Sequence, residues 1–157
     1  MPDSEPTISR QTLTDFANGL ASATPSPGSG AAGAVALALA AGCAAKAFSI
    51  SNRHRPDNSL ERATDRARVI SAIALEAAQR DGDDFRAWLR SHTASAVAAL
   101  QEDARALFSL SCELEQLLND NRGNVIASLE PDLLSAWDLI GAFKAIESRN
   151  TDALQAP

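Results

Sequence analysis

The feature that most constrains this chain is a run of small residues behind a loop rich in proline and glycine. The loop reads TPSPGSG over residues 24–30, and the residues that follow, to about Ile50, are mostly alanine and glycine. Alanine is the best helix former, and small side chains let neighbouring helices approach closely, a device best known from membrane proteins. The run therefore predicts a central helix against which other helices pack.

The composition favours helices in the rest of the chain as well. Hydrophobic residues make up 45% of the 157 residues, but aromatic residues only 4%, and tyrosine is absent. A β-sandwich would require more β-branched and aromatic side chains. The length fits one domain, so we expect a single helical domain over residues 1–157, with loose tails at 1–8 and 151–157.

Apolar side chains at helical spacing predict the individual helices. They are expected at about 13–22, 30–51, 58–80, 83–118 and 131–148, where the fourth range forms either one helix or two. Thr12 and Asp15 form a plausible capping box, Asn58 is the expected cap of the third helix, and Gly82 its expected end. The short connections predict an all-α fold, an up-and-down bundle of five or six helices with a small-residue-rich central helix.

Charge and hydropathy restrict the partners. The net charge of −6 argues against a nucleic-acid partner, which would call for a basic face. The uncharged run from Gly30 to Ala45 is too short and too rich in alanine for a membrane span. Residues 1–10 are polar and contain two prolines, unlike a signal peptide. We therefore expect a cytoplasmic protein without membrane, nucleic-acid or metal partners.

Gly28, Gly30 and Gly33 spell a GxGxxG pattern at the start of the central helix. A dinucleotide-binding fold needs a strand before this pattern, and the preceding residues ASATPSP do not form one. A phosphate loop is excluded because no Gly-Lys-Ser/Thr sequence follows. Two interpretations remain: a plain helix start, or a helix start whose exposed N–H groups bind a polar ligand.

Other polar residues also allow two interpretations. Arg53 and Arg55 belong to a basic turn, which is either a solvated, self-paired surface or a landing site for a polyanionic tail. Asp81, beside Gly82, is either a cap or a general acid or base. Asn124 and Asp132 first suggest a turn residue and a helix cap.

Three stretches resemble the cyclodeaminase domain of formiminotransferase-cyclodeaminase and its stand-alone methenyltetrahydrofolate cyclohydrolase relatives. The first, LTDFANGLASATPSPGSGAAGAVALALAAG, is similar to that family's short helix, P-x-P-G-G-G-S loop and alanine-rich helix. The second, AQRDGDDFRAWL, resembles its acidic segment and aligns the family's aspartate with Asp81. The third, RGNVIASLEPDLLSAW, resembles the segment before its last helix and aligns Gly123, Asn124 and Asp132.

The resemblance implies a tetrahydrofolate derivative as substrate, in a polyglutamylated form where the tail is present, and no permanently bound cofactor. It implies hydrolysis of methenyltetrahydrofolate or deamination of formiminotetrahydrofolate, with Asp81 as the catalytic residue. The absence of an attached transferase domain slightly favours the hydrolysis. The expected substrate-binding residues are Pro27, Gly28, Ser29, Gly30, Arg53, Arg55, Asn124 and Asp132. The family also implies a homodimer.

One difference from the family keeps an alternative open. Ser29 stands where the loop of the family has glycine. A serine forced into a positive φ would be strained by about 1 kcal/mol, whereas an ordinary φ would accept it. The alternative is a catalytically inactive helical module that binds folate or another protein on the same scaffold.

Overall fold

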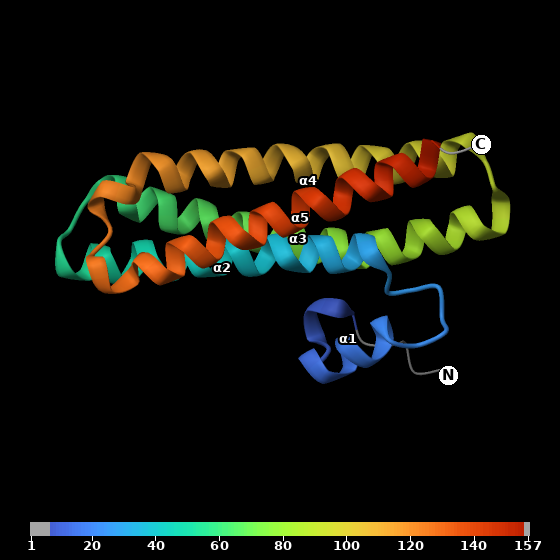
Figure 1. Cartoon of the computed structure of the whole chain (residues 1–157), viewed down its shortest axis with the longest axis horizontal. Coiled ribbons are helices and arrows are strands. Elements are labelled where there is room, and N and C mark those ends of the chain that lie inside the picture. The colour runs from blue at the N-terminus through green and yellow to red at the C-terminus, as the bar shows by residue number, and fades with distance from the viewer. Residues whose placement is uncertain (1–6, 156–157) are drawn as a thin grey trace.

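The computed structural model describes residues 7–155, which contain five α-helices and no β-strand. The helices are α1 (Leu13–Leu20), α2 (Ser29–His54), α3 (Asn58–Ser91), α4 (Ala94–Asn121) and α5 (Glu130–Gln155), with short 3₁₀ turns η1 (Ile8–Arg10), η2 (Arg122–Asn124) and η3 (Ala127–Leu129). The four long helices lie side by side and alternate in direction, while α1 lies outside the bundle (Figure 1). The predicted all-α, up-and-down architecture is confirmed.

The predicted central helix is α2, which packs most extensively against α3 and then against α5. Most of its buried residues are alanines, and Ala34, Ala41 and Ala44 are completely buried. These small side chains let α3 approach closely. The Ser71 hydroxyl on α3 donates a hydrogen bond of 3.0 Å to the Ala38 carbonyl of α2. Larger side chains from the other helices, among them Phe143, complete the core.

By length and hydropathy alone, α2 meets the criteria for a membrane-spanning helix. Its best window of 18 residues has a mean hydropathy of 1.7, but 56% of that window is buried inside the bundle. The core helix of a soluble protein has the same properties, so the apolar character of α2 is accounted for by its contacts within this chain.

The third helix does not end where the sequence predicts. It continues through Gly82 to Ser91. Gly82 serves helix packing and does not end the helix, since a Cβ there would overlap the Ser26 hydroxyl of the loop before α2. Its N-cap is Asp57, whose carboxylate accepts the Ser59 N–H at 2.7 Å, and not Asn58. The helix ends at His92, which adopts the left-handed conformation and separates α3 from α4.

The ends of the chain also differ from the expectation. Residues 151–155 belong to α5, which continues past its predicted end at Ser148. Ile8 begins η1, and its N–H donates to the Gln79 side chain of α3 at 2.9 Å. The remaining residues of the two expected tails, 1–6 and 156–157, lie outside the described range. The predicted capping box of Thr12 and Asp15 is confirmed.

Candidate active site

The loop before α2 is held in place by contacts with two helices. The Pro27 ring packs on Gly19 of α1, where a Cβ would lie 3.0 Å from the proline Cδ. Ser26 packs against Gly82 of α3, and the Ser26–Pro27 peptide is cis. These contacts fix Gly28 as the N-cap of α2. The first turn of the helix therefore has a defined position, and its N–H groups donate to no side chain of the N-cap residue, which is a glycine.

The Asp81 carboxylate of α3 takes the place of a capping side chain as a hydrogen-bond acceptor. The Ala31 N–H in the first turn of α2 donates to its carboxylate. Glycine is required beside it, because a Cβ at Gly30 would overlap the Asp81 carboxyl group. Burial raises the pKa of Asp81 to about 6; the Ala31 N–H opposes this shift, and the charges of Asp84 and Asp103 add to it.

A second carboxylate, Glu147 of α5, faces α2 one helical turn further along. Only 7% of Glu147 is exposed, and a Cβ at Gly33 would lie 3.1 Å from its Oε1. Burial raises the pKa of Glu147 to about 7; the charge of Asp81 raises it further, and a hydrogen bond from Asn150 opposes the shift. The Asn150 Oδ1 in turn accepts a 2.7 Å hydrogen bond from the Ser29 hydroxyl. The partly buried Asp81 carboxylate thus acts on the buried Glu147 across the start of α2.

The two carboxylates line a pocket of about 290 Å³. Phe85 and Trp88 of α3 form one wall, with ring centroids 5.4 Å apart, and the ring of His92 meets Trp88 edge-on at 5.3 Å. Leu100 of α4 also lines the pocket. An apolar aromatic wall beside a few polar groups is typical of a site for a small organic ligand with a flat ring.

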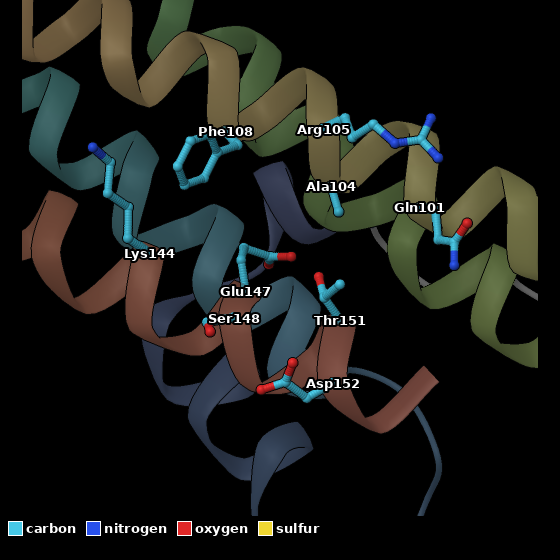
Figure 2. Close-up of a pocket in the computed structure, with 9 residues that line it drawn as sticks. All are labelled: Gln101, Ala104, Arg105, Phe108, Lys144, Glu147, Ser148, Thr151 and Asp152. Carbon is cyan, nitrogen blue, oxygen red and sulfur yellow. The ribbon is translucent and has the colours of Figure 1, made fainter. Parts of the chain in front are cut away.

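A second hollow of about 470 Å³ continues from this pocket between α4 and α5. The two cavities share Gln101, Ala104, Glu147 and Thr151. Figure 2 shows the residues that line this outer hollow, with Glu147 directed between the two helices. Its cations already have carboxylate partners: Lys144 lies 2.6 Å from Glu115, and Arg105 lies 2.7 Å from Glu102. Glu147 therefore stands at the boundary between an inner pocket and an open outer hollow.

The structure brings together one part of the predicted site. Gly28, Ser29, Gly30 and Asp81 all line the inner pocket. Pro27 supports the loop through its contact with α1 and is not among the lining residues. The predicted cluster of backbone groups and one carboxylate therefore exists within a single chain.

The other predicted residues lie at the opposite end of the bundle. Arg53 is 24 residues after Ser29 in the same helix, which corresponds to a distance of about 36 Å at 1.5 Å per residue. Arg55 follows at the end of that helix. Asn124 donates to Asp57 at 3.3 Å, and Asp132 forms an ion pair with Lys46 at 2.7 Å. Within one chain, none of these four residues contacts the inner pocket.

Ser29 occupies its position without backbone strain. It is the first residue of α2, and His92 is the only non-glycine residue with a positive φ in the described range. The serine is therefore compatible with the loop, and its hydroxyl gains a partner in Asn150.

Sequence reasoning missed Glu147 and Asn150. A signal for Glu147 was available, because the apolar stripe of Leu133, Ile140 and Phe143 continues at helical spacing to this position. A carboxylate on the buried stripe of a helix indicates either a paired charge or a functional group. Asn150 gave no comparable signal, since it falls beyond the predicted end of the last helix.

The fold is an all-helical bundle with a pocket at one end. The sequence model of formiminotransferase-cyclodeaminase matches residues 12–109, which is more than half of the chain. The chain belongs to the formiminotransferase-cyclodeaminase family. The segment 122–137, which also resembles the family, lies beyond the matched residues.

A solved structure shares the fold. The crystal structure of formiminotetrahydrofolate cyclodeaminase from Thermotoga maritima superimposes with a TM-score of 0.85 at 20% identity, over 94% of this chain and 79% of that one. No curated protein matches the chain. The fold is therefore that of a folate-processing helical enzyme family.

Proposed function

We propose that this protein binds a one-carbon derivative of tetrahydrofolate at the start of α2 and acts on its one-carbon group, as a methenyltetrahydrofolate cyclohydrolase or a formiminotetrahydrofolate cyclodeaminase. The observation that carries the proposal is Asp81, a carboxylate with a raised pKa beside the first turn of α2 and next to an aromatic wall. Such a group can stabilise a cationic carbon and accept a proton near neutral pH.

The cyclohydrolase reaction is the favoured form of the proposal. Water attacks the cationic carbon that bridges two nitrogens, so that a C–O bond forms while Asp81 takes a proton from the water. One C–N bond then breaks, the nitrogen that leaves gains a proton, and the carbon becomes a formyl group. In the deamination, N10 attacks the formimino carbon and ammonia leaves. Both reactions depend on proton transfers to and from the nitrogen or oxygen atoms bonded to the same carbon.

The dimensions of the site suit a ligand that is longer than the inner pocket. A volume of about 290 Å³ is near the lower end for small-molecule sites, which suits the fused rings and the one-carbon group. Phe85 and Trp88 would stack on these rings, and the first-turn N–H groups of α2 would bind a polar edge. The remainder of the folate would extend into the outer hollow, which shares four lining residues with the inner pocket.

The proposal extends to a homodimer in the cytoplasm. Leu39 lies on the outward face of α2 and is 50% exposed, and a Cβ at Gly42 would have no atom within 4 Å. A second copy can cover this smooth apolar face. Arg53, Arg55, Asn124 and Asp132 would then contact a ligand, including its polyglutamate tail, only from the second copy. The molar mass in solution, measured by light scattering, tests the association.

The decisive experiment follows the near-ultraviolet absorbance of methenyltetrahydrofolate in the presence of purified protein. We expect the absorbance to disappear faster than in the spontaneous reaction. A parallel assay measures ammonia released from formiminotetrahydrofolate and identifies the reaction. If neither reaction is accelerated, the protein is not this enzyme. Folate binding measured in the same sample would then identify the inactive, folate-binding alternative.

A further inference from the structure

Glu147 is a buried acidic group that the mechanism above does not use. It is 7% exposed, and within residues 7–155 it forms no ion pair, although Lys144 and Arg105 line the same hollow and are paired elsewhere. A buried carboxyl group without a counter-charge costs stability, and an apolar residue would continue the stripe of α5 at no such cost. A structural role alone therefore does not account for a glutamate here.

The surroundings of Glu147 place it beside Asp81. Gly30 and Gly33 are three residues apart on α2, and their missing side chains make room for the carboxyl groups of Asp81 and Glu147 respectively. The charged residues that line a cavity together with Glu147 are Asp81 on α3, Arg105 on α4, and Lys144 and Asp152 on α5, while α2 contributes no charged residue to either cavity. Two carboxyl groups that line one pocket disfavour a state in which both are charged, so one of them tends to keep its proton.

Resting on the proposed function, we propose that Glu147 is the second catalytic residue of this site and holds the proton that the leaving nitrogen receives. Asp81 takes the proton of the attacking water as the C–O bond forms. The Glu147 carboxyl group then protonates the leaving nitrogen as the C–N bond breaks. The carboxylate that results removes the hydroxyl proton as the C=O bond forms, and Asp81 gives its proton to solvent. The step consumes one water and releases one proton, which balances the conversion of a cationic substrate to a neutral formyl product.

Glu147 is linked through Asn150 to the start of α2. The Asn150 side chain forms a hydrogen bond with Glu147 and accepts a hydrogen bond of 2.7 Å from the Ser29 hydroxyl. The orientation of Glu147 is therefore linked to the first residue of α2. The link joins α5 to the loop that the substrate would contact. It also holds the carboxyl group at the boundary of the two hollows, where the one-carbon group of a long ligand would lie.

The test compares Glu147→Gln with the wild type in the methenyltetrahydrofolate assay. Glutamine keeps the size of the side chain and the bond to Asn150 but holds no transferable proton. We expect kcat to fall by about 100-fold with KM nearly unchanged, since a positioned acid contributes roughly 10²–10⁴-fold. The wild-type kcat should fall at low pH, where Asp81 is protonated, and at high pH, where Glu147 loses its proton. Glu147→Gln should lose only the high-pH decrease.

Two further variants separate a catalytic from a structural effect. Glu147→Asp retains an acid and should keep the high-pH decrease, while Glu130→Gln, on the first turn of the same helix, should match the wild type. Circular dichroism reports whether each variant is folded. If the wild type is active and a folded Glu147→Gln variant stays within threefold of it with both pH limbs intact, this inference is overturned and the proposed function stands. If Glu147→Gln does not fold, loss of the high-pH decrease in Glu147→Asp overturns it. A wild type that accelerates neither reaction overturns both.

Discussion

Two pairs of carboxylates, one at each end of the bundle, have opposite surroundings. At the end where α2 finishes, Asp132 pairs with Lys46 at 2.7 Å, and Glu130 lies 3.3 Å from Arg122. At the end where α2 begins, Glu147 is buried and Asp81 is partly buried, and the structure gives neither an ion pair within residues 7–155. The first two carboxylates are ion-paired, as is usual on a protein surface, whereas Asp81 and Glu147 have no such partner in the part of the chain that the structure describes.

This difference separates structural acids from functional ones. A partly exposed carboxylate with a cation beside it keeps its proton affinity low and contributes little stability. A buried carboxylate beside another keeps a proton near neutral pH, which costs stability but suits proton transfer. The family resemblance points to both ends, and the physical chemistry favours the beginning of α2 as the site.

The largest effect is expected for Asp81→Asn. The amide oxygen can still accept the Ala31 N–H, so the fold is retained, but the variant lacks a base. We expect kcat to fall by roughly 10²–10⁴-fold in the methenyltetrahydrofolate assay. Thermal unfolding at pH 8 should show a variant at least as stable as the wild type, because a buried charge is removed. Full activity in Asp81→Asn would rule out Asp81 as the base and weaken the contrast between the two ends.

The next effect is expected for Gly30→Ala. Its Cβ would overlap the Asp81 carboxyl group, which must move and lose the Ala31 N–H. We expect stability to fall by about 1–3 kcal/mol from this overpacking, and kcat to fall at least about tenfold.

The matched control for that variant is Gly141→Ala in α5, where a Cβ would meet no atom within 4 Å. It should be more stable by up to about 1 kcal/mol, because alanine is the better helix former, and fully active. Chemical denaturation and the same assay measure both variants. Equal kcat values for Gly30→Ala and Gly141→Ala would show that the position of Asp81 is unimportant.

A smaller effect concerns stability as a function of pH. In the folded protein the pKa of Asp81 is about 6 and that of Glu147 about 7, both above their usual values, so the folded state binds more protons than the unfolded state between about pH 4 and pH 7. These two groups should therefore lower stability as pH rises through this window, with no further change above it. The Asp81→Asn/Glu147→Gln double variant should therefore gain stability relative to the wild type as pH rises from 4 to 8.

Glu113 provides a control of the opposite sign. Its hydrogen bonds to Arg66 lower the pKa of Glu113, so its contribution is present above its unfolded pKa and is lost as pH falls through the folded one. Glu113→Gln should therefore be less stable than the wild type at pH 7, and the difference should shrink in acid. Denaturation at several pH values measures both trends. A double variant whose stability runs parallel to that of the wild type at all pH values would contradict the raised pKa values.

The sequence predicted the fold better than it predicted the site, for a physical reason. Helices follow from local periodicity, so α1, α2 and the starts of α3 and α5 were predicted, whereas a helix boundary was expected at Gly82, where α3 continues to Ser91. Gly82 misled because its role is tertiary: it makes room for Ser26 inside α3. The site brings together the ends of long antiparallel helices, and sequence order does not tell which ends meet. Only the family resemblance placed Asp81 and Gly30 in one site, and the structure shows that they are neighbours. The same resemblance grouped Arg53 with residues that lie about 36 Å away along α2.

The smallest effect is expected at Ser29, where this chain differs from its family. In Ser29→Gly, the bond to Asn150 is lost and a helix residue becomes more flexible, so stability should fall by about 0.5–1 kcal/mol. We expect kcat/KM to stay within about threefold of the wild type, because one neutral hydrogen bond contributes about 1 kcal/mol or less. Ser29→Ala removes the hydroxyl but keeps the Cβ, so the two variants together separate the hydrogen bond from the bulk. An increase of tenfold or more in Ser29→Gly, absent from Ser29→Ala, would show that the side chain obstructs the ligand, and the beginning of α2 would then be a site that this chain has partly closed.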